Sequence, residues 1–123
     1  MTSRIAQLTL DVRDARAVAD FWAAALGLRA ELGDDGAGML YPPADAPTWQ
    51  QTIWLQPVHE PKRGKVRLHL DLRPVDGDVE AEVQRLIELG ASRADVGQQG
   101  TEDFTVLSDP EGNEFCILHT DPR

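Results

Sequence analysis

One motif occurs twice in this chain, and that repeat constrains the fold more than any other feature. Each copy opens with a run in which apolar and polar residues alternate, Ile5 to Val12 in the first and Val66 to Leu72 in the second. Alternation of this kind predicts a half-buried strand. A helical pattern follows each run and ends in Leu-Gly, at Leu26-Gly27 and at Leu89-Gly90. The sequence therefore predicts two tandem units of about 60 residues each.

Both predicted helices carry start and stop signals. Asp14 precedes the first helix, expected over residues 15–26, and an Asp side chain accepts the free N–H groups of a first turn. The second helix is expected over residues 78–89. Each has an apolar stripe at helical spacing. Gly27 is the expected left-handed stop of the first helix, and Gly90 ends the second.

Three short strand-like runs follow each helix. They cover residues 28–32, 37–41 and 51–56 in the first half, and residues 92–96, 104–107 and 114–118 in the second. Each half is thus predicted to be β-α-β-β-β, with unit one at about 4–56 and unit two at about 66–119. Residues 57–65 are expected to be an exposed linker. The prediction is a single α+β domain over residues 1–123.

Composition limits the partners of the protein. The formal net charge is -9, from 21 acidic and 12 basic side chains, whereas nucleic-acid binding requires a basic surface. An anionic membrane surface would repel the chain for the same reason. The single cysteine rules out an internal disulfide and a zinc-finger spacing. We find no signal peptide and no apolar run long enough to span a bilayer, so a cytoplasmic location is expected.

A tight turn, Asp-Pro-Glu-Gly-Asn at residues 109–113, enters the last predicted strand. Together with the repeat and with His-Leu-Asp-Leu at residues 69–72, it resembles the vicinal oxygen chelate superfamily of glyoxalases, bleomycin-resistance proteins and extradiol dioxygenases. The resemblance covers about residues 4 to 119 and points to the small single-domain glyoxalase-like group. It implies that the two βαβββ units form a cupped mixed sheet with a cleft, and that the protein is a homodimer.

The resemblance also implies where metal ligands would lie, on the first and last strands of each unit. Carried over by position, the first-strand sites fall on Gln7 and His69, and the last-strand site of unit two falls on Cys116. Gln56 is the candidate for the matching site in unit one. The metalloenzymes of the superfamily usually supply at least one carboxylate at these positions. A thiolate with one imidazole would instead favour zinc or copper.

The candidates of unit two also have structural interpretations. His69 is either a hydrogen-bonded histidine of a half-buried cleft or a metal ligand or base. Asp71 shares its face and could orient the imidazole, although residues two apart on a strand lie nearly 7 Å apart. Cys116 is most often a small buried hydrophobe. Glu114 shares the face of Cys116 and could replace it as a ligand.

The remaining cleft candidates belong to unit one. Gln7 and Thr9 lie on the polar face of the first strand, which is either a solvated sheet face or a cleft wall. Trp54 and Gln56 share a face of a later strand. An aromatic side chain in a cleft would suit a flat or apolar ligand, and core packing is the competing interpretation.

Two function classes follow. The first is a metal-free protein that binds a small molecule, as the drug-resistance members of the superfamily do. The second is a metal-dependent lyase, isomerase or dioxygenase, whose divalent metal would stabilise an enolate or oxyanion of a substrate with vicinal oxygens. The incomplete ligand set favours the binder and argues against glyoxalase I activity.

Overall fold

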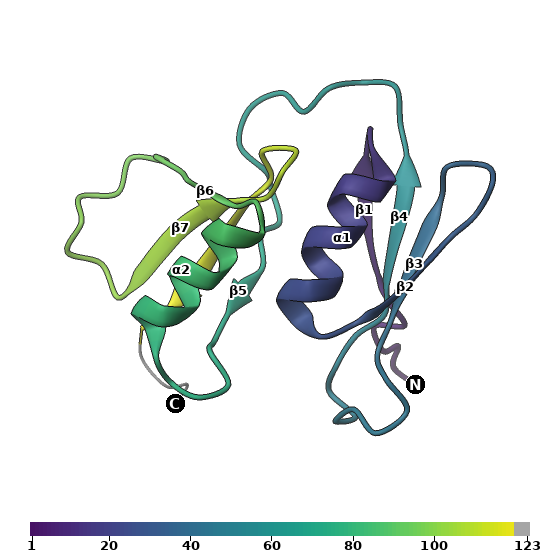
Figure 1. The fold of residues 1–123 in the computed structure, drawn as a ribbon, viewed down its shortest axis with the longest axis horizontal. Coiled ribbons are helices and arrows are strands. Elements are labelled where there is room, and N and C mark those ends of the chain that lie inside the picture. Colours follow the sequence, from purple (N-terminus) through teal and green to yellow (C-terminus); the bar gives the residue numbers. More distant parts are fainter. Residues whose placement is uncertain (120–123) are drawn as a thin grey trace. The chain divides into compact units, whose positions relative to one another are not determined.

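The structure is a computed structural model that describes residues 1–119. The chain divides between Pro61 and Lys62 into two compact units, and this division falls inside the predicted linker. In each unit the elements follow the order β-α-β-β-β (Figure 1). This order confirms the predicted α+β class and the tandem βαβββ repeat. No helix of the described part of the chain is long and apolar enough to cross a membrane.

The first unit is a four-stranded sheet with one helix. Its elements are β1 (Leu8–Val12), α1 (Ala15–Leu26), β2 (Arg29–Leu32), β3 (Gly38–Tyr41) and β4 (Ile53–Pro57). The strands lie in the order β1-β4-β3-β2, with β1 parallel to β4 and the other pairs antiparallel. A parallel pair requires a long crossover, which α1 and the β2–β3 hairpin provide.

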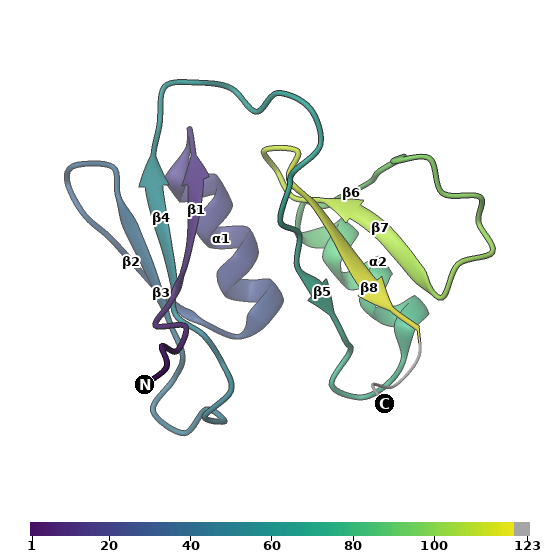
Figure 2. The same ribbon diagram turned by 180° about the vertical axis from the view of Figure 1, so that it is seen from behind.

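The second unit has the same topology. Its elements are β5 (Asp71–Leu72), α2 (Val79–Leu89), β6 (Ser92–Arg93), β7 (Phe104–Ser108) and β8 (Glu114–Leu118). The strand order is β5-β8-β7-β6, and β5 is parallel to β8. In both units the helix covers one face of its own sheet (Figures 1 and 2). Identical strand orders in the two halves confirm that the sequence repeat is a structural repeat.

Local signals set the helix ends where the sequence predicts them. The Asp14 carboxylate accepts the N–H of Ala17 at 3.2 Å, and Gly27 ends α1 with φ of 70°. Asp78, predicted as the first helical residue, is instead the N-cap of α2, and its carboxylate accepts the N–H of Ala81 at 3.1 Å. Side-chain capping of this kind satisfies N–H groups that have no partner inside the helix.

Each helix buries its apolar stripe against the adjacent face of its sheet. The fully or almost fully buried side chains include Val18, Phe21, Leu40 and Leu55 in the first unit and Leu86, Leu107, Phe115 and Ile117 in the second. On β8, Phe115 and Ile117 alternate with Glu114, Cys116 and Leu118, and neighbours along a strand point to opposite faces. The face of this sheet that carries Cys116 is therefore the one that α2 leaves uncovered.

Two strands of unit two are shorter than predicted. β5 was expected from Val66, but it begins at Asp71; at the expected start, the N–H of Val66 donates to the Glu114 carboxylate at 3.2 Å. β6 was expected to reach Val96, but it ends at Arg93. The N–H of Val96 donates to the side chain of Gln98 at 2.7 Å. In both places a side-chain oxygen accepts a backbone N–H that the predicted strand would have paired with a neighbouring strand.

The strand boundaries of unit one also differ from the predicted ones, by one to three residues. β1 begins at Leu8, not at Ile5. Pro57, assigned to the linker, is the last residue of β4. Its carbonyl can still accept a hydrogen bond although it has no N–H to donate, which is compatible with the end of a strand.

Candidate functional site

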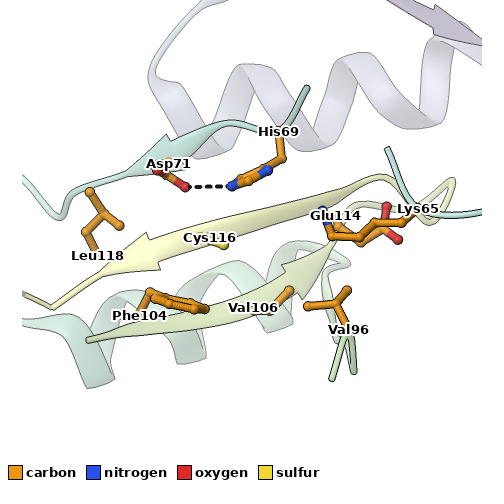
Figure 3. A pocket seen from close by; sticks show the side chains of 9 residues that line it. All are labelled: Lys65, His69, Asp71, Val96, Phe104, Val106, Glu114, Cys116 and Leu118. Carbon is orange, nitrogen blue, oxygen red and sulfur yellow. Dashed lines mark ion pairs between the residues drawn. The ribbon is translucent and has the colours of Figure 1, made fainter. Parts of the chain in front are cut away.

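A cavity of about 330 Å³ lies on the uncovered face of the unit-two sheet. It is lined by Lys65, His69, Asp71, Val96, Phe104, Val106, Glu114, Cys116 and Leu118. Figure 3 shows Phe104 and Val106 on β7 beside Cys116 and Leu118 on β8. Apolar side chains from two strands thus form the floor, and charged or polar side chains surround it.

Three residues with different ligand atoms meet at this cavity. The His69 imidazole, the Asp71 carboxylate and the Cys116 thiol each place one such atom within 4.8 Å of the others. Strand register brings two of them together, because Asp71 on β5 is the direct partner of Cys116 on β8. The carboxylate that β8 lacks at position 116 is supplied here by β5.

His69 and Asp71 form a direct contact, with 3.3 Å between Nε2 and Oδ1 (Figure 3). The spacing of a regular strand would hold the two residues nearly 7 Å apart. His69 precedes the short strand β5, so that spacing does not apply to it. Both side chains stay accessible, at 39% and 47% exposure, and can therefore reach a bound molecule.

The Cys116 thiol is held in its neutral form. Burial is the main cause that raises the pKa of Cys116, and the charge of Asp71 and its hydrogen bond to the thiol raise it further. The positive charge of Lys65 acts in the opposite direction. A thiol of this kind is a weak nucleophile, since the thiolate is the reactive form.

Glu114 lines the cavity, but its carboxylate is already engaged. Lys62 Nζ lies 3.0 Å from Oε1 and 3.2 Å from Oε2, and the N–H of Val66 donates to Oε1. Burial alone would raise the pKa of Glu114, but the hydrogen bonds from Lys62 and from backbone N–H groups lower it overall. The carboxylate is thus ionised and paired, so it is less suited than Asp71 to complete a ligand set with Cys116.

The turn before β8 fixes the register that brings these groups together. Asp109 is only 3% exposed, and its Oδ1 accepts the N–H groups of Glu111 and Asn113 at 2.9 and 3.0 Å. The Asn113 side chain donates to Oδ2 at 3.0 Å. Gly112 has φ of 86°, a conformation that side chains with a Cβ rarely adopt. The turn therefore leads into β8 with Glu114 and Cys116 on the cavity face.

The predicted residues of unit one do not line this cavity. Thr9 and Trp54 are direct partners across β1 and β4 and share a face of that sheet. Gln56 pairs with Asp11, four residues beyond Gln7, which corresponds to about 13 Å along a strand. Gln7 thus precedes β1 and is not the register partner of Gln56, and both residues are exposed. Trp54 Nε1 is buried and has no hydrogen-bond partner within residues 1–119.

The apolar floor of the cavity and the cation on its wall, Lys65, were not predicted from the sequence. Phe104 and Val106 were identified only as a strand, and Lys65 was assigned to the linker. The alternation of side chains along a strand offered a signal for Val106. Val106 pairs with Cys116 across β7 and β8, so the two side chains lie on the same face of the sheet.

Comparisons with known proteins agree with this architecture. The profile of the glyoxalase-like domain family matches residues 7–118. Among curated proteins, no sequence matches the chain.

Solved structures show a similar fold. The fosfomycin resistance protein FosX from Mesorhizobium loti aligns with a TM-score of 0.72 at 12% identity, covering 98% of this chain and 94% of that one. An E126Q mutant of FosX from Listeria monocytogenes, complexed with Mn(II) and 1S,2S-dihydroxypropylphosphonic acid, gives 0.72 at 13% identity, covering 98% and 93%.

A glyoxalase/bleomycin resistance protein/dioxygenase family enzyme from Burkholderia phytofirmans gives a TM-score of 0.67 at 19% identity, covering 91% of this chain and 94% of that one. These likenesses confirm the predicted fold. The family match spans nearly the whole chain and confirms the predicted glyoxalase/bleomycin-resistance type. The chain therefore belongs to the glyoxalase-like domain family, within the vicinal oxygen chelate superfamily.

Proposed function

We propose that the protein binds a small organic molecule in the cavity of unit two and needs no metal to hold it. One observation carries this proposal: an apolar floor and a set of accessible polar groups line the same cavity. Its volume of about 330 Å³ is at the lower end of the range for ligand pockets, so the ligand is small. Each 40 Å² of apolar ligand surface buried on the floor would contribute about 1 kcal/mol.

The polar groups of the cavity are suited to orienting such a ligand. The imidazole of His69 and the carboxylate of Asp71 are positioned by their mutual contact and remain accessible. The protonated thiol of Cys116 adds a small, polarizable surface between them and the floor. A metal-free binder is favoured because the carboxylates on the cavity are already hydrogen-bonded and the thiol is protonated.

The test is binding of a small-molecule library to two variants that carry the same substitution. Val96→Phe places a larger side chain at the cavity, whereas Val75→Phe changes a fully exposed residue of the same unit. We expect ligands found by thermal shift to lose about tenfold or more in affinity on Val96→Phe, because the cavity is small. Affinity should be unchanged on Val75→Phe. A ligand that binds both variants equally would contradict the proposed site.

The second candidate function is a metal-dependent enzyme, and the meeting of His69, Asp71 and Cys116 favours it. Ligand atoms around a tetrahedral zinc ion lie roughly 3.3–3.8 Å apart, so atoms within 4.8 Å need only a small side-chain rotation. Nitrogen, oxygen and sulfur donors suit zinc better than magnesium or manganese. The ion would act as a Lewis acid on a substrate oxygen. Cys116 would have to release its proton on binding.

Cobalt(II) distinguishes the two functions, because a cobalt–thiolate bond gives an intense near-ultraviolet absorption. Stoichiometric binding of cobalt or zinc that is lost on His69→Ala would establish the metal site and contradict the metal-free function. A protein that remains metal-free after equilibration with zinc, nickel, manganese and iron would exclude the metalloenzyme. Absorption and metal content report this without any substrate.

We also propose that four residues of unit one form a second, separate candidate binding surface on that unit: Gln7, Thr9, Trp54 and Gln56. The indole N–H of Trp54 supports their inclusion, because a buried donor without a partner costs about 1–3 kcal/mol and gains from a ligand acceptor. Quenching of Trp54 fluorescence by a bound ligand, measured in a Trp22→Phe and Trp49→Phe background, tests this.

We also propose a homodimer and a cytoplasmic location. Light scattering on the purified protein and cell fractionation would test these two points.

A further inference from the structure

We infer that the ligand of this cavity is a small apolar molecule with a single negative charge, a monocarboxylate, and that Lys65 binds its charged group. The inference rests on the proposed function and specifies the chemical class of the ligand. It follows from which charges on the cavity wall have partners and which do not.

Lys65 is the cation on the cavity wall that lacks a partner. It forms no ion pair or hydrogen bond with any residue of the described chain, 1–119. The other lysine, Lys62, is paired with Glu114. In Figure 3 the ammonium group of Lys65 extends along the cavity wall, and the oxygens of Glu114 turn the other way. Lys65 is exposed and lines the cavity, and its positive charge acts on the Cys116 thiol.

The negative groups of the cavity are compensated differently. Glu114 accepts hydrogen bonds from Lys62 and from the N–H of Val66. Asp71 contacts the His69 imidazole on one side and the Cys116 thiol on the other. Each carboxylate thus has donors from the protein itself, whereas the ammonium of Lys65 has no acceptor among the residues that the structure describes. Charge complementarity therefore favours an anionic group on the ligand.

One charge fits this cavity better than two. Lys65 supplies a single unpaired positive charge, and Asp71 would repel any additional negative charge nearby. The protein also carries a formal net charge of -9, which opposes the approach of multivalent anions. The apolar floor of Phe104, Val106 and Leu118, together with the lining side chain of Val96, requires a hydrophobic body. An aromatic or branched aliphatic monocarboxylate satisfies both conditions.

Four probes with a common aromatic ring test the inference: phenylacetate, phenylacetamide, phenethylamine and phenylphosphonate. They present a single negative charge, no charge, a positive charge and up to two negative charges. Binding is measured by amide chemical-shift changes in the ¹⁵N-labelled wild-type protein at pH 7.5. We expect phenylacetate to bind tightest and to shift the amides of β7 and β8.

Three variants assign the preference to Lys65. Lys65→Met keeps an unbranched side chain that lacks the terminal ammonium group, and so removes the charge. Lys65→Arg keeps the charge, and Arg63→Met removes a neighbouring charge that does not line the cavity. We expect Lys65→Met to weaken phenylacetate binding about three- to tenfold and to leave phenylacetamide unchanged. Lys65→Arg and Arg63→Met should both retain the preference. Because Lys65 is exposed, Lys65→Met should fold normally, which circular dichroism checks.

The outcomes separate the inference from the proposed function. Stronger binding of the amide, the amine or the phosphonate, or equal binding of phenylacetate to wild type and Lys65→Met, would overturn the monocarboxylate inference alone. Failure of all four probes to shift any amide of the cavity, up to millimolar concentration, would overturn both the inference and the proposed site. Preferential phenylacetate binding that depends on Lys65 would establish both.

Discussion

The turn at Asp109 offers a direct test of how the site is held. In Asp109→Ala, the N–H groups of Glu111 and Asn113 lose an ionised acceptor that is only 3% exposed. A hydrogen bond to a charged group contributes about 1.5–3 kcal/mol, and water would replace part of the loss because the turn is half-buried. We expect the free energy of unfolding to fall by about 3 kcal/mol. The corresponding drop in Tm is roughly 10–15 °C for a domain of this size.

Asp109→Asn distinguishes the loss of the hydrogen-bond acceptor from the loss of the negative charge, because asparagine keeps an acceptor oxygen and removes the charge. The amide keeps an oxygen at the Oδ1 position, which receives both backbone N–H groups, but it places an NH₂ group against the Asn113 side chain. We expect a loss of about 1 kcal/mol for this variant. Asp103→Ala is the control, since Asp103 is exposed and should change stability by less than about 0.5 kcal/mol.

Urea denaturation gives the three free energies, and hydrogen exchange reports on the site itself. The N–H of Cys116 donates to the carbonyl of Leu70 at 2.9 Å and should lose protection in Asp109→Ala, because the register of β8 depends on the turn. An alanine variant within about 0.5 kcal/mol of wild type would refute this reasoning. So would an asparagine variant that loses as much stability as the alanine variant.

Three further predictions concern single side chains. In Asp71→Asn the pKa of Cys116 should fall but stay above its ordinary value, because burial remains; the pH dependence of alkylation of this single cysteine measures it. The pKa of Glu114 is lowered in the folded protein, so its pairing with Lys62 contributes its full stability at pH values above the ordinary carboxyl pKa. This contribution disappears as the pH falls through the lower folded-state pKa. The stability difference between wild type and Glu114→Gln should therefore be up to about 1 kcal/mol at pH 7 and should vanish near pH 3 in urea titrations. Gly27→Ala should cost about 1 kcal/mol from backbone strain alone, since nothing lies within 4 Å of the added Cβ; an unchanged Tm would contradict this.

The sequence predicted those features of the fold that depend on local signals. Alternation and turn signals predicted the number and order of the strands, and Asp14 and Gly27 marked the ends of α1 correctly because capping involves only neighbouring residues. Strand ends were less predictable. At the expected start of β5, the N–H of Val66 donates to the Glu114 carboxylate, which lies 48 positions further along the chain. The hydrophobic periodicity of a short segment carries no information about a hydrogen-bond partner so distant in the sequence.

The candidate site was predictable in part for the same reason. His69 and Cys116 were identified by position, and Asp71 was identified as a residue of the same face as His69. The direct contact between His69 and Asp71 could not be derived, because it exists only where the strand is not yet regular. Lys65 was overlooked because a charged residue in a proline-containing linker is normally solvated. Its role on the cavity wall depends on the path of the chain past β8.

The parallel pairing of first and last strands has a consequence for how the protein folds. Leu8 lies 45 positions before its partner Ile53, and Asp71 lies 45 positions before its partner Cys116. Closing such a long segment is slow compared with forming the β2–β3 or β7–β8 hairpins, because the chain loses more entropy before the contact forms. In each unit, the first strand should therefore join last. The meeting of His69, Asp71 and Cys116 would then be among the final events of folding, so a partly folded chain would show its hairpins and helices before it could bind a ligand.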